Sequence, residues 1–247
     1  MPDEIPDKPY GWRARIGYTS PPLTTEVFPY EFYKLVPDGV SLVVTSLAIT
    51  VRSKDEIDQS YEISMKAARE MKVAGCNIIC LGGVPINVSR GQANAEQMIV
   101  ELERELGIKV STSQSAQKKA AKLLGSRKVV MAHPYAEKDT ARIAGYNAHM
   151  GCETLGAMGW GNDFNKIGGT PRNAAVIMGR KLMKAHPQAD TIMFPSPHWP
   201  TLEAIDALEA EFRVNVISAL QVIVWDALRR VGIDDKINGA GRLFREF

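Results

Sequence analysis

Residues 102–124, LERELGIKVSTSQSAQKKAAKLL, and residues 208–230, LEAEFRVNVISALQVIVWDALRR, match each other at a constant offset of 106 positions. Each copy contains the end of a helix, a short apolar strand and another helix. A further apolar strand lies upstream of each copy, at 77–81 and at 191–194. Strands that alternate with helices indicate an α/β fold with parallel sheets and right-handed crossovers. The repeat predicts two pseudo-symmetric lobes, each with a parallel sheet flanked by helices.

Two loops of small or turn-forming residues, 82–85 and 195–198, directly follow these upstream strands. Ligands of open parallel sheets bind beyond the carboxyl ends of the strands. Two equivalent loops at such positions predict one active-site cleft between the lobes. A duplication that kept no chemistry would leave the same repeat. We divide the chain into lobes of residues 1–125 and 126–247, and the C-terminal helix is free to pack on the first.

Further elements follow from apolar runs and turn residues. Strands are expected at 15–19, 41–47, 128–132 and 154–158, and helices at 29–35, 55–73, 137–149 and 170–185. The two prolines Pro21 and Pro22 should stop the first strand, because proline supplies no ladder donor. Thr170, followed by a proline, is the expected N-cap of the last of these helices. The glycine-rich segment 160–169 is expected to be a loop at the edge of the cleft.

Composition narrows the class of protein. The 247 residues carry 30 basic and 28 acidic side chains, a net charge of +2, with no basic block. Nucleic acid is therefore not an expected partner. The longest apolar runs are strand-sized and no signal pattern is seen, so we expect a cytoplasmic protein that does not bind membranes. No heptad seam specifies a partner helix, which leaves a homo-oligomer open.

Three cysteines, Cys76, Cys80 and Cys152, form an odd and sparse set. A disulfide framework does not fit such a set. Cys76 and Cys80 flank or occupy a predicted buried strand and show no metal-ligand spacing. We expect buried structural thiols and no metal site.

Two of the four histidines, His133 and His198, directly follow predicted strands, and prolines restrict the backbone beside both. Histidine carries protons near neutral pH, so His198 beside Ser196 predicts a general acid or base, or a hydroxyl–base pair. A hydrogen-bonded loop histidine without a catalytic role is the alternative. No Gly-x-Ser-x-Gly elbow supports a serine hydrolase.

Groups suited to holding a carboxylate are also predicted near strand ends. The amides of the Gly82-Gly83 turn could approach an anion closely. Thr25, Tyr135 and Ser218 add hydroxyl donors. Lys and Arg are absent from the predicted loop tips except at position 90, which favours a mono- or dicarboxylate over a phosphate.

The chain resembles the aspartate/glutamate racemase superfamily, in its branch of arylmalonate decarboxylases and maleate cis-trans isomerases. Six segments carry the resemblance, in matching order and spacing, and span most of the chain: 16–22, 31–40, 89–91, 132–135, 225–229 and 241–244. The resemblance implies two pseudo-symmetric α/β lobes, a site between them, and a reaction that needs no metal or organic cofactor.

Each lobe of the racemases and maleate isomerases contributes a cysteine to the site, and arylmalonate decarboxylase keeps only the second. These positions align with Gly83 and Ser196, so both cysteines are replaced here. Among the substrate-binding positions that the resemblance assigns, Tyr135 matches a carboxylate-binding tyrosine and Pro21 a pocket wall. Val84 and its following proline replace hydroxyl residues of the decarboxylase's oxyanion pocket.

Three functions are compatible with these residues. The first is a cofactor-independent lyase, decarboxylase-like, which acts on a small carboxylate through a carbanion or enediolate. In it Tyr135, Ser196 and Ser218 hold charge, and His198 or His133 moves the proton. The second is a maleate-isomerase-like isomerase, or a hydrolase that uses Ser196 as nucleophile. The third is a carboxylate-binding protein without activity, because a fold alone does not fix a function.

Overall fold

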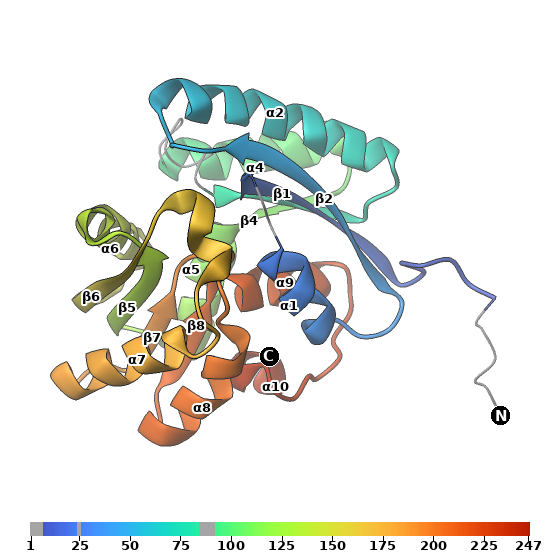
Figure 1. Cartoon of the computed structure of the whole chain (residues 1–247). Helices are drawn as coiled ribbons and strands as arrows, with labels where there is room; N and C mark the ends of the chain where they lie inside the picture. Colours follow the sequence, from blue (N-terminus) through green and yellow to red (C-terminus); the bar gives the residue numbers. More distant parts are fainter. Residues whose placement is uncertain (1–6, 24–25, 84–91) are drawn as a thin grey trace.

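A computed structural model describes residues 7–23, 26–83 and 92–247, and it contains two four-stranded sheets whose paired strands are all parallel (Figure 1). The first sheet has the order β2-β1-β3-β4 and the second the order β6-β5-β7-β8. The first four strands are β1 (Ala14–Pro22), β2 (Val40–Ile49), β3 (Ile78–Leu81) and β4 (Lys109–Thr112). The others are β5 (Lys128–Tyr135), β6 (Glu153–Asn162), β7 (Thr191–Phe194) and β8 (Asn215–Ser218). The same strand order in both sheets confirms the predicted pair of pseudo-symmetric units.

Helices cover the outer face of each sheet (Figure 1). The first sheet carries α2 (Lys54–Val73) and α4 (Gln92–Leu106), and the second carries α7 (Ala174–Ala185) and α8 (Leu202–Phe212). The start of α2 is set by Ser53, whose side chain accepts a hydrogen bond from the amide of Glu56. Met65, Met71 and neighbouring apolar residues of this helix form a separate core cluster with β3 and α4. The predicted helix at 55–73 is thus confirmed to within one residue.

Two helices, α5 (Ser113–Leu124) and α9 (Ala219–Arg230), lie against each other between the sheets (Figure 1). Each contacts strands of both sheets, and α9 also contacts α1 (Val27–Leu35). Asp226 of α9 accepts hydrogen bonds from Ser111 of β4, over 2.6 Å, and from Lys119 of α5, over 2.8 Å. The main hydrophobic core accordingly includes residues of both halves. A lobe boundary between residues 125 and 126 stays a prediction.

The first strand runs through the prolines that were expected to end it. Up to Thr19, β1 pairs with β3 on one side and with β2 on the other. Beyond Thr19 only β2 remains as a neighbour, and its register with β1 shifts between Ser20 and Pro22. A proline is tolerated at such an irregularity, because fewer ladder bonds require its missing N–H. The extension carries Pro21 to the carboxyl end of the sheet.

Two segments of the second half differ from expectation. The helix expected at 137–149 is three short pieces, η1 (Glu137–Asp139), α6 (Thr140–Ala144) and η2 (Gly145–Met150). The segment expected as a loop contains the end of β6 and a 3-10 helix, η3 (Phe164–Gly169). Thr170 ends η3 and donates its hydroxyl hydrogen to the carbonyl of Ile167, so α7 begins only at Ala174. The helix expected at 170–185 is present and ends as expected, but it begins at Ala174 and Thr170 is not its N-cap.

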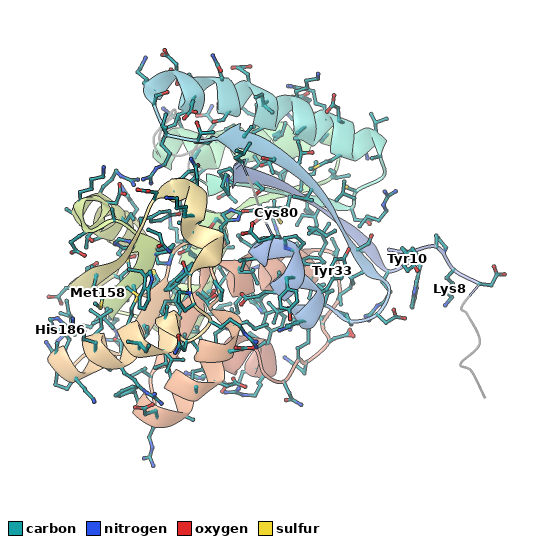
Figure 2. All side chains as sticks on the ribbon, in the orientation of Figure 1. Lys8, Tyr10, Tyr33, Cys80, Met158 and His186 are labelled. Carbon is teal, nitrogen blue, oxygen red and sulfur yellow. The ribbon has the colours of Figure 1, made fainter. Side chains whose placement is uncertain are left out.

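Cys76, Cys80 and Cys152 are buried and form no disulfide, as expected. Figure 2 shows Cys80 in the interior of the molecule. Burial raises the pKa of its thiol far above the ordinary value. No helix in the part of the chain that the structure describes combines the length and the apolar character needed to cross a membrane.

Candidate active site

A pocket of about 720 Å³ of atom-free space lies at the carboxyl ends of β1, β5 and β7. The loop after β2, the first turns of α5 and the segment 142–150 complete its wall. Tyrosine, proline and histidine side chains come from the strands and the loops after them, and the other elements add both polar and apolar side chains. The lining residues are Tyr18, Pro21, Pro22, Arg52, Gly83, Ser113, Gln114, Gln117, Tyr135, Arg142, Ile143, Asn147, Met150, Phe164, Pro195, Pro197 and His198. The pocket lies where the repeat predicted a cleft.

Ser196 lies between two pocket-lining prolines and is 2% exposed. The Tyr135 hydroxyl donates a hydrogen bond to Ser196 Oγ over 3.0 Å. Tyr135 is the last residue of β5, and its ring stacks on that of Phe164, with the ring centroids 6.0 Å apart. The two predicted residues are therefore in contact, and both are held by packing.

His198 is 4% exposed and lines the pocket, and its Nε2 is 3.0 Å from the hydroxyl of Tyr18. Tyr18 lines the same pocket and stacks on Phe28, with centroids 3.9 Å apart. Burial lowers the pKa of His198 to about 3 and raises that of Tyr18 well above its ordinary value. Both groups are consequently neutral near pH 7. Tyr18 was missed in the sequence, where it is one more apolar-strand residue.

His133 has a different environment. It is fully buried and is not among the lining residues, and its Nε2 is 2.9 Å from Thr140 Oγ1. Its Nδ1 is buried without a hydrogen-bond partner among the described residues. Burial lowers its pKa to about 4. Of the two strand-end histidines, His198 is the one that faces the pocket.

The remaining predicted binding residues are placed unequally. Pro21 and Gly83 line the pocket. Ser218 does not; it is the N-cap of α9, and its Oγ is 2.6 Å from Thr201 Oγ1. Thr112, its counterpart in the repeat, caps α5, so the repeat preserves a helix start at this position. Thr25 and Val84 lie outside the described residues, and substrate contacts by any of these positions stay predictions.

Two cationic side chains line the pocket, and both come from segments other than the loop tips predicted from the sequence. Arg52 follows β2, and Arg142 belongs to α6. Both guanidinium groups donate to Asp139, over 2.9 Å each. Burial would raise the pKa of Asp139, but these hydrogen bonds hold it below its ordinary value. No sequence pattern indicates the cluster, because its members come from segments about 90 residues apart.

Glu56 fixes the backbone that carries Arg52. Its carboxylate accepts hydrogen bonds from the amides of Thr50, Val51 and Arg52 and from the Thr50 hydroxyl. The hydroxyl bond and these amides lower the pKa of Glu56 to about 2. Arg52 has a φ of 59°, a left-handed conformation that non-glycine residues seldom adopt without such support. The loop therefore holds Arg52 in one place.

No group of three His, Cys, Asp or Glu side chains in residues 7–23, 26–83 and 92–247 is arranged to hold a metal ion. Polar contacts in the pocket come instead from hydroxyl, amide and guanidinium groups. Such groups bind and orient anions, and hydroxyls can also transfer protons.

Comparison with known proteins assigns the chain to a family. A model of arylmalonate decarboxylase matches residues 16–244. The chain belongs to the arylmalonate decarboxylase family. Arylmalonate decarboxylase of Bordetella bronchiseptica is 27% identical over 237 residues, covering 94% of this chain and 96% of that protein. The relationship confirms the resemblance inferred from the sequence and makes the chain an enzyme of decarboxylase or isomerase type.

Solved structures of the same family have the same architecture. A crystal structure of arylmalonate decarboxylase has a TM-score of 0.80 at 26% identity, covering 94% of this chain and all of that one. A liganded double variant, with one glycine changed to cysteine and one cysteine to serine, has a TM-score of 0.84 at 25% identity and covers 95% of this chain and 100% of that chain. The maleate isomerase of Pseudomonas putida S16, solved with maleate, shares the fold at 20% identity, with a TM-score of 0.83 over 94% of this chain and 97% of that chain.

Proposed function

We propose that the chain is a cofactor-independent lyase that decarboxylates a small mono- or dicarboxylate, or performs a related elimination, through a carbanion or enediolate. One observation carries the proposal: two hydrogen-bonded pairs, Tyr135 with Ser196 and Tyr18 with His198, adjoin one pocket of a decarboxylase-family fold. The second pair offers a proton in a chain that has Gly83 and Ser196 at the two positions aligned with the family's cysteines.

The first pair suits the charge that the reaction creates. Loss of CO₂ leaves the electrons of the broken carbon–carbon bond on the α-carbon, from which they spread into the remaining carboxylate. Ser196 accepts a hydrogen bond from Tyr135, so its own hydroxyl hydrogen can be donated to that carboxylate. Pro21, Ile143 and Phe164 form an apolar wall of the pocket. A carboxylate against this wall is poorly hydrated, which favours its departure as uncharged CO₂.

The second pair returns the proton. In this scheme the Tyr18 hydroxyl protonates the α-carbon, and the Nε2–H of His198 donates to the phenolate oxygen that results. An α-carbanion of a carboxylate is far more basic than a phenolate, so the transfer is downhill even with the raised pKa of Tyr18. Solvent then restores the tyrosine proton. One proton is consumed for each CO₂ released, which balances the reaction.

The same contacts give less support to a serine nucleophile with a histidine base. Ser196 accepts from Tyr135, and His198 Nε2 is paired with Tyr18. The pKa of about 3 also makes His198 a weak base. A maleate-isomerase-like isomerase that acts on a small carboxylic acid is the alternative, since the chain shares its fold with a maleate isomerase.

The test is an assay of the purified chain on phenylmalonate, methylmalonate, malonate and maleate in deuterium oxide. We expect Tyr18→Phe and His198→Gln to lower kcat about 100-fold or more, the usual contribution of general acid catalysis. Ser196→Ala should mainly raise KM. The product should carry one deuterium at the α-carbon. His186→Ala, at the C-cap of α7 and away from the pocket, is the matched control (Figure 2).

Full activity in both Tyr18→Phe and His198→Gln would rule out these roles. Because His198 is neutral above about pH 4, kcat should show no titration of this imidazole between pH 5 and 8. Trapping of Ser196 by a serine-directed electrophile, located by peptide mass mapping, would favour the hydrolase. Binding of these acids in a thermal-shift screen without turnover of any would favour a non-catalytic binding protein.

A further inference from the structure

The pocket has a second polar region that the decarboxylation chemistry does not use. Arg52, Arg142, Asn147 and Gln114 contribute to it, from four different elements. Asp139 is the carboxylate that the structure places against the two guanidinium groups. Two guanidinium groups thus share one carboxylate at the pocket, while the Glu56 carboxylate accepts from backbone amides of the Arg52 loop. Guanidinium groups that line a pocket attract an anion and disfavour a cation.

Arg52 is held rigidly next to the proposed reaction site. Its guanidinium lies 5.1 Å from the ring centroid of Tyr135 and 4.8 Å from that of Phe164. The side chain is 17% exposed. Tyr135 is also the donor to Ser196. An anion bound by Arg52 would therefore adjoin the carboxylate held by Tyr135 and Ser196, and little side-chain entropy remains to be lost on binding.

Asn147 supplies an independent sign of a ligand. It is fully buried and lines the pocket, and its Nδ2 donates to Thr154 Oγ1 over 2.9 Å. Its Oδ1 is buried without a hydrogen-bond partner among the described residues, as is Oε1 of Gln114. A buried carbonyl oxygen without a donor is costly and is usually satisfied by a ligand or water. The region thus combines positive charge with acceptors that await a donor.

Resting on the proposed lyase function, we infer that this region is a second subsite, which binds the carboxylate of a hydroxylated, acidic arm of the substrate through Arg52 and the hydroxyl group of that arm through Asn147. A hydroxyl fits better than an ammonium group as the donor, because two guanidinium groups would repel a second cation. The natural substrate accordingly carries a charged, hydroxylated arm where an arylmalonate carries a ring.

Binding experiments can test the subsite without turnover. We would measure binding by calorimetry to the full chain with three probes: malate, succinate, which lacks the hydroxyl, and 3-hydroxybutyrate, which replaces one carboxylate of malate by a methyl group. We expect malate to bind at least 10-fold more tightly than either. Arg52→Met should weaken malate at least 10-fold while 3-hydroxybutyrate changes less than twofold.

Two further variants separate recognition from folding. Arg52→Lys keeps the charge and should recover part of the malate affinity. Asn147→Ala should remove the preference for malate over succinate. Arg180→Met is the matched control, because this arginine pairs with Glu211 on the surface. Equal affinity for the three probes, or an equal loss of all three in Arg52→Met, would overturn the subsite.

Failure of the subsite and failure of the lyase are distinguishable. Malate binding that depends on Arg52, without decarboxylation of any malonate, would support the subsite and contradict the lyase. If Arg52→Met decarboxylates phenylmalonate at an unchanged rate and the chain shows no preference for malate, the lyase would be supported and the subsite contradicted.

Discussion

The loops after β3 and β7 hold equivalent positions in the two sheets but contribute different chemistry. The first brings backbone close: the amide of Gly82 donates to Thr19 Oγ1 over 2.9 Å, and Gly82 has no room for a side chain. The second presents side chains: His198 lines the pocket, Ser196 is hydrogen-bonded to the pocket-lining Tyr135, and Trp199 packs edge-on against Phe194 at 5.6 Å. A duplicated fold can thus keep its symmetry while one copy supplies shape and the other supplies functional groups.

The strongest test of this difference between the two loops is to add a methyl group to the first loop. The Cβ of Gly82→Ala would collide with the carbonyl oxygen of Thr19 and come within 2.5 Å of Pro21 Cδ. We expect a loss of about 3 kcal/mol or more in the free energy of unfolding, because backbone cannot move aside cheaply. Urea denaturation measures it. Gly169→Ala, with no atom within 4 Å of its Cβ, is the control, and an equal effect at both positions would contradict the explanation.

The end of the second loop should make stability depend on pH. Glu31 of α1 accepts hydrogen bonds from the amides of Thr201 and Leu202, and burial raises its pKa to about 7. The folded chain then binds more protons than the unfolded chain between about pH 4.5 and 7, so stability falls as pH rises through that window. The fall is on the order of 3 kcal/mol.

Glu31→Gln removes the titrating group and should flatten this part of the profile. Thermal unfolding from pH 4 to 8, compared with the unsubstituted chain, is the measurement. A profile with unchanged slope in the variant would assign the pH dependence to other groups.

A thiol in the second loop should increase the functional difference between the two loops. Ser196→Cys places a group with an ordinary pKa of about 8.5 where the hydroxyl lies. We expect decarboxylation to rise by roughly 10-fold, because the thiol adds a second proton donor, more acidic than the Tyr18 hydroxyl. Iodoacetamide should then inactivate the variant. Gly83→Cys, on the first loop, should give no such increase, and an equal gain from both substitutions would mean that the loops are interchangeable.

The smallest effect is expected from the loop after β2, which lies outside both copies of the repeat. Glu56→Gln weakens the acceptor for three amides, so Arg52 should be held less firmly. We expect malate affinity to fall about threefold, by analogy with the loss of one modest hydrogen bond. Calorimetry checks this, and Glu62→Gln on the same helix is the control. An unchanged affinity would separate Glu56 from the subsite.

Sequence alone predicted the fold and several of the residues that line the pocket. The repeat and the strand-to-loop transitions predicted both sheets and the pocket at their carboxyl ends, because parallel strands deliver their ends to one edge. Tyr135, Pro21 and Gly83 were expected at the pocket and line it. Their contacts with a substrate remain to be measured.

What sequence could not predict depends on contacts between distant segments. Tyr18 is hidden in an apolar run, and only its partner His198 distinguishes it from a core residue. Arg52 depends on Glu56 for its backbone and on Asp139 for its orientation. In the sequence, the hydroxyl of Ser218 at a strand end fits a ligand donor and a helix cap equally well. In the structure Ser218 is the N-cap of α9.

The paired helices α5 and α9 between the sheets bear on how such a chain could arise. Each lies against the other and against strands of both halves. A single unit, with four strands and one such helix, would leave the inner side of that helix bare to water. Its ancestor would have been viable only as a pair of identical subunits, and fusion of the two genes would have turned an obligate subunit interface into the interior of one chain.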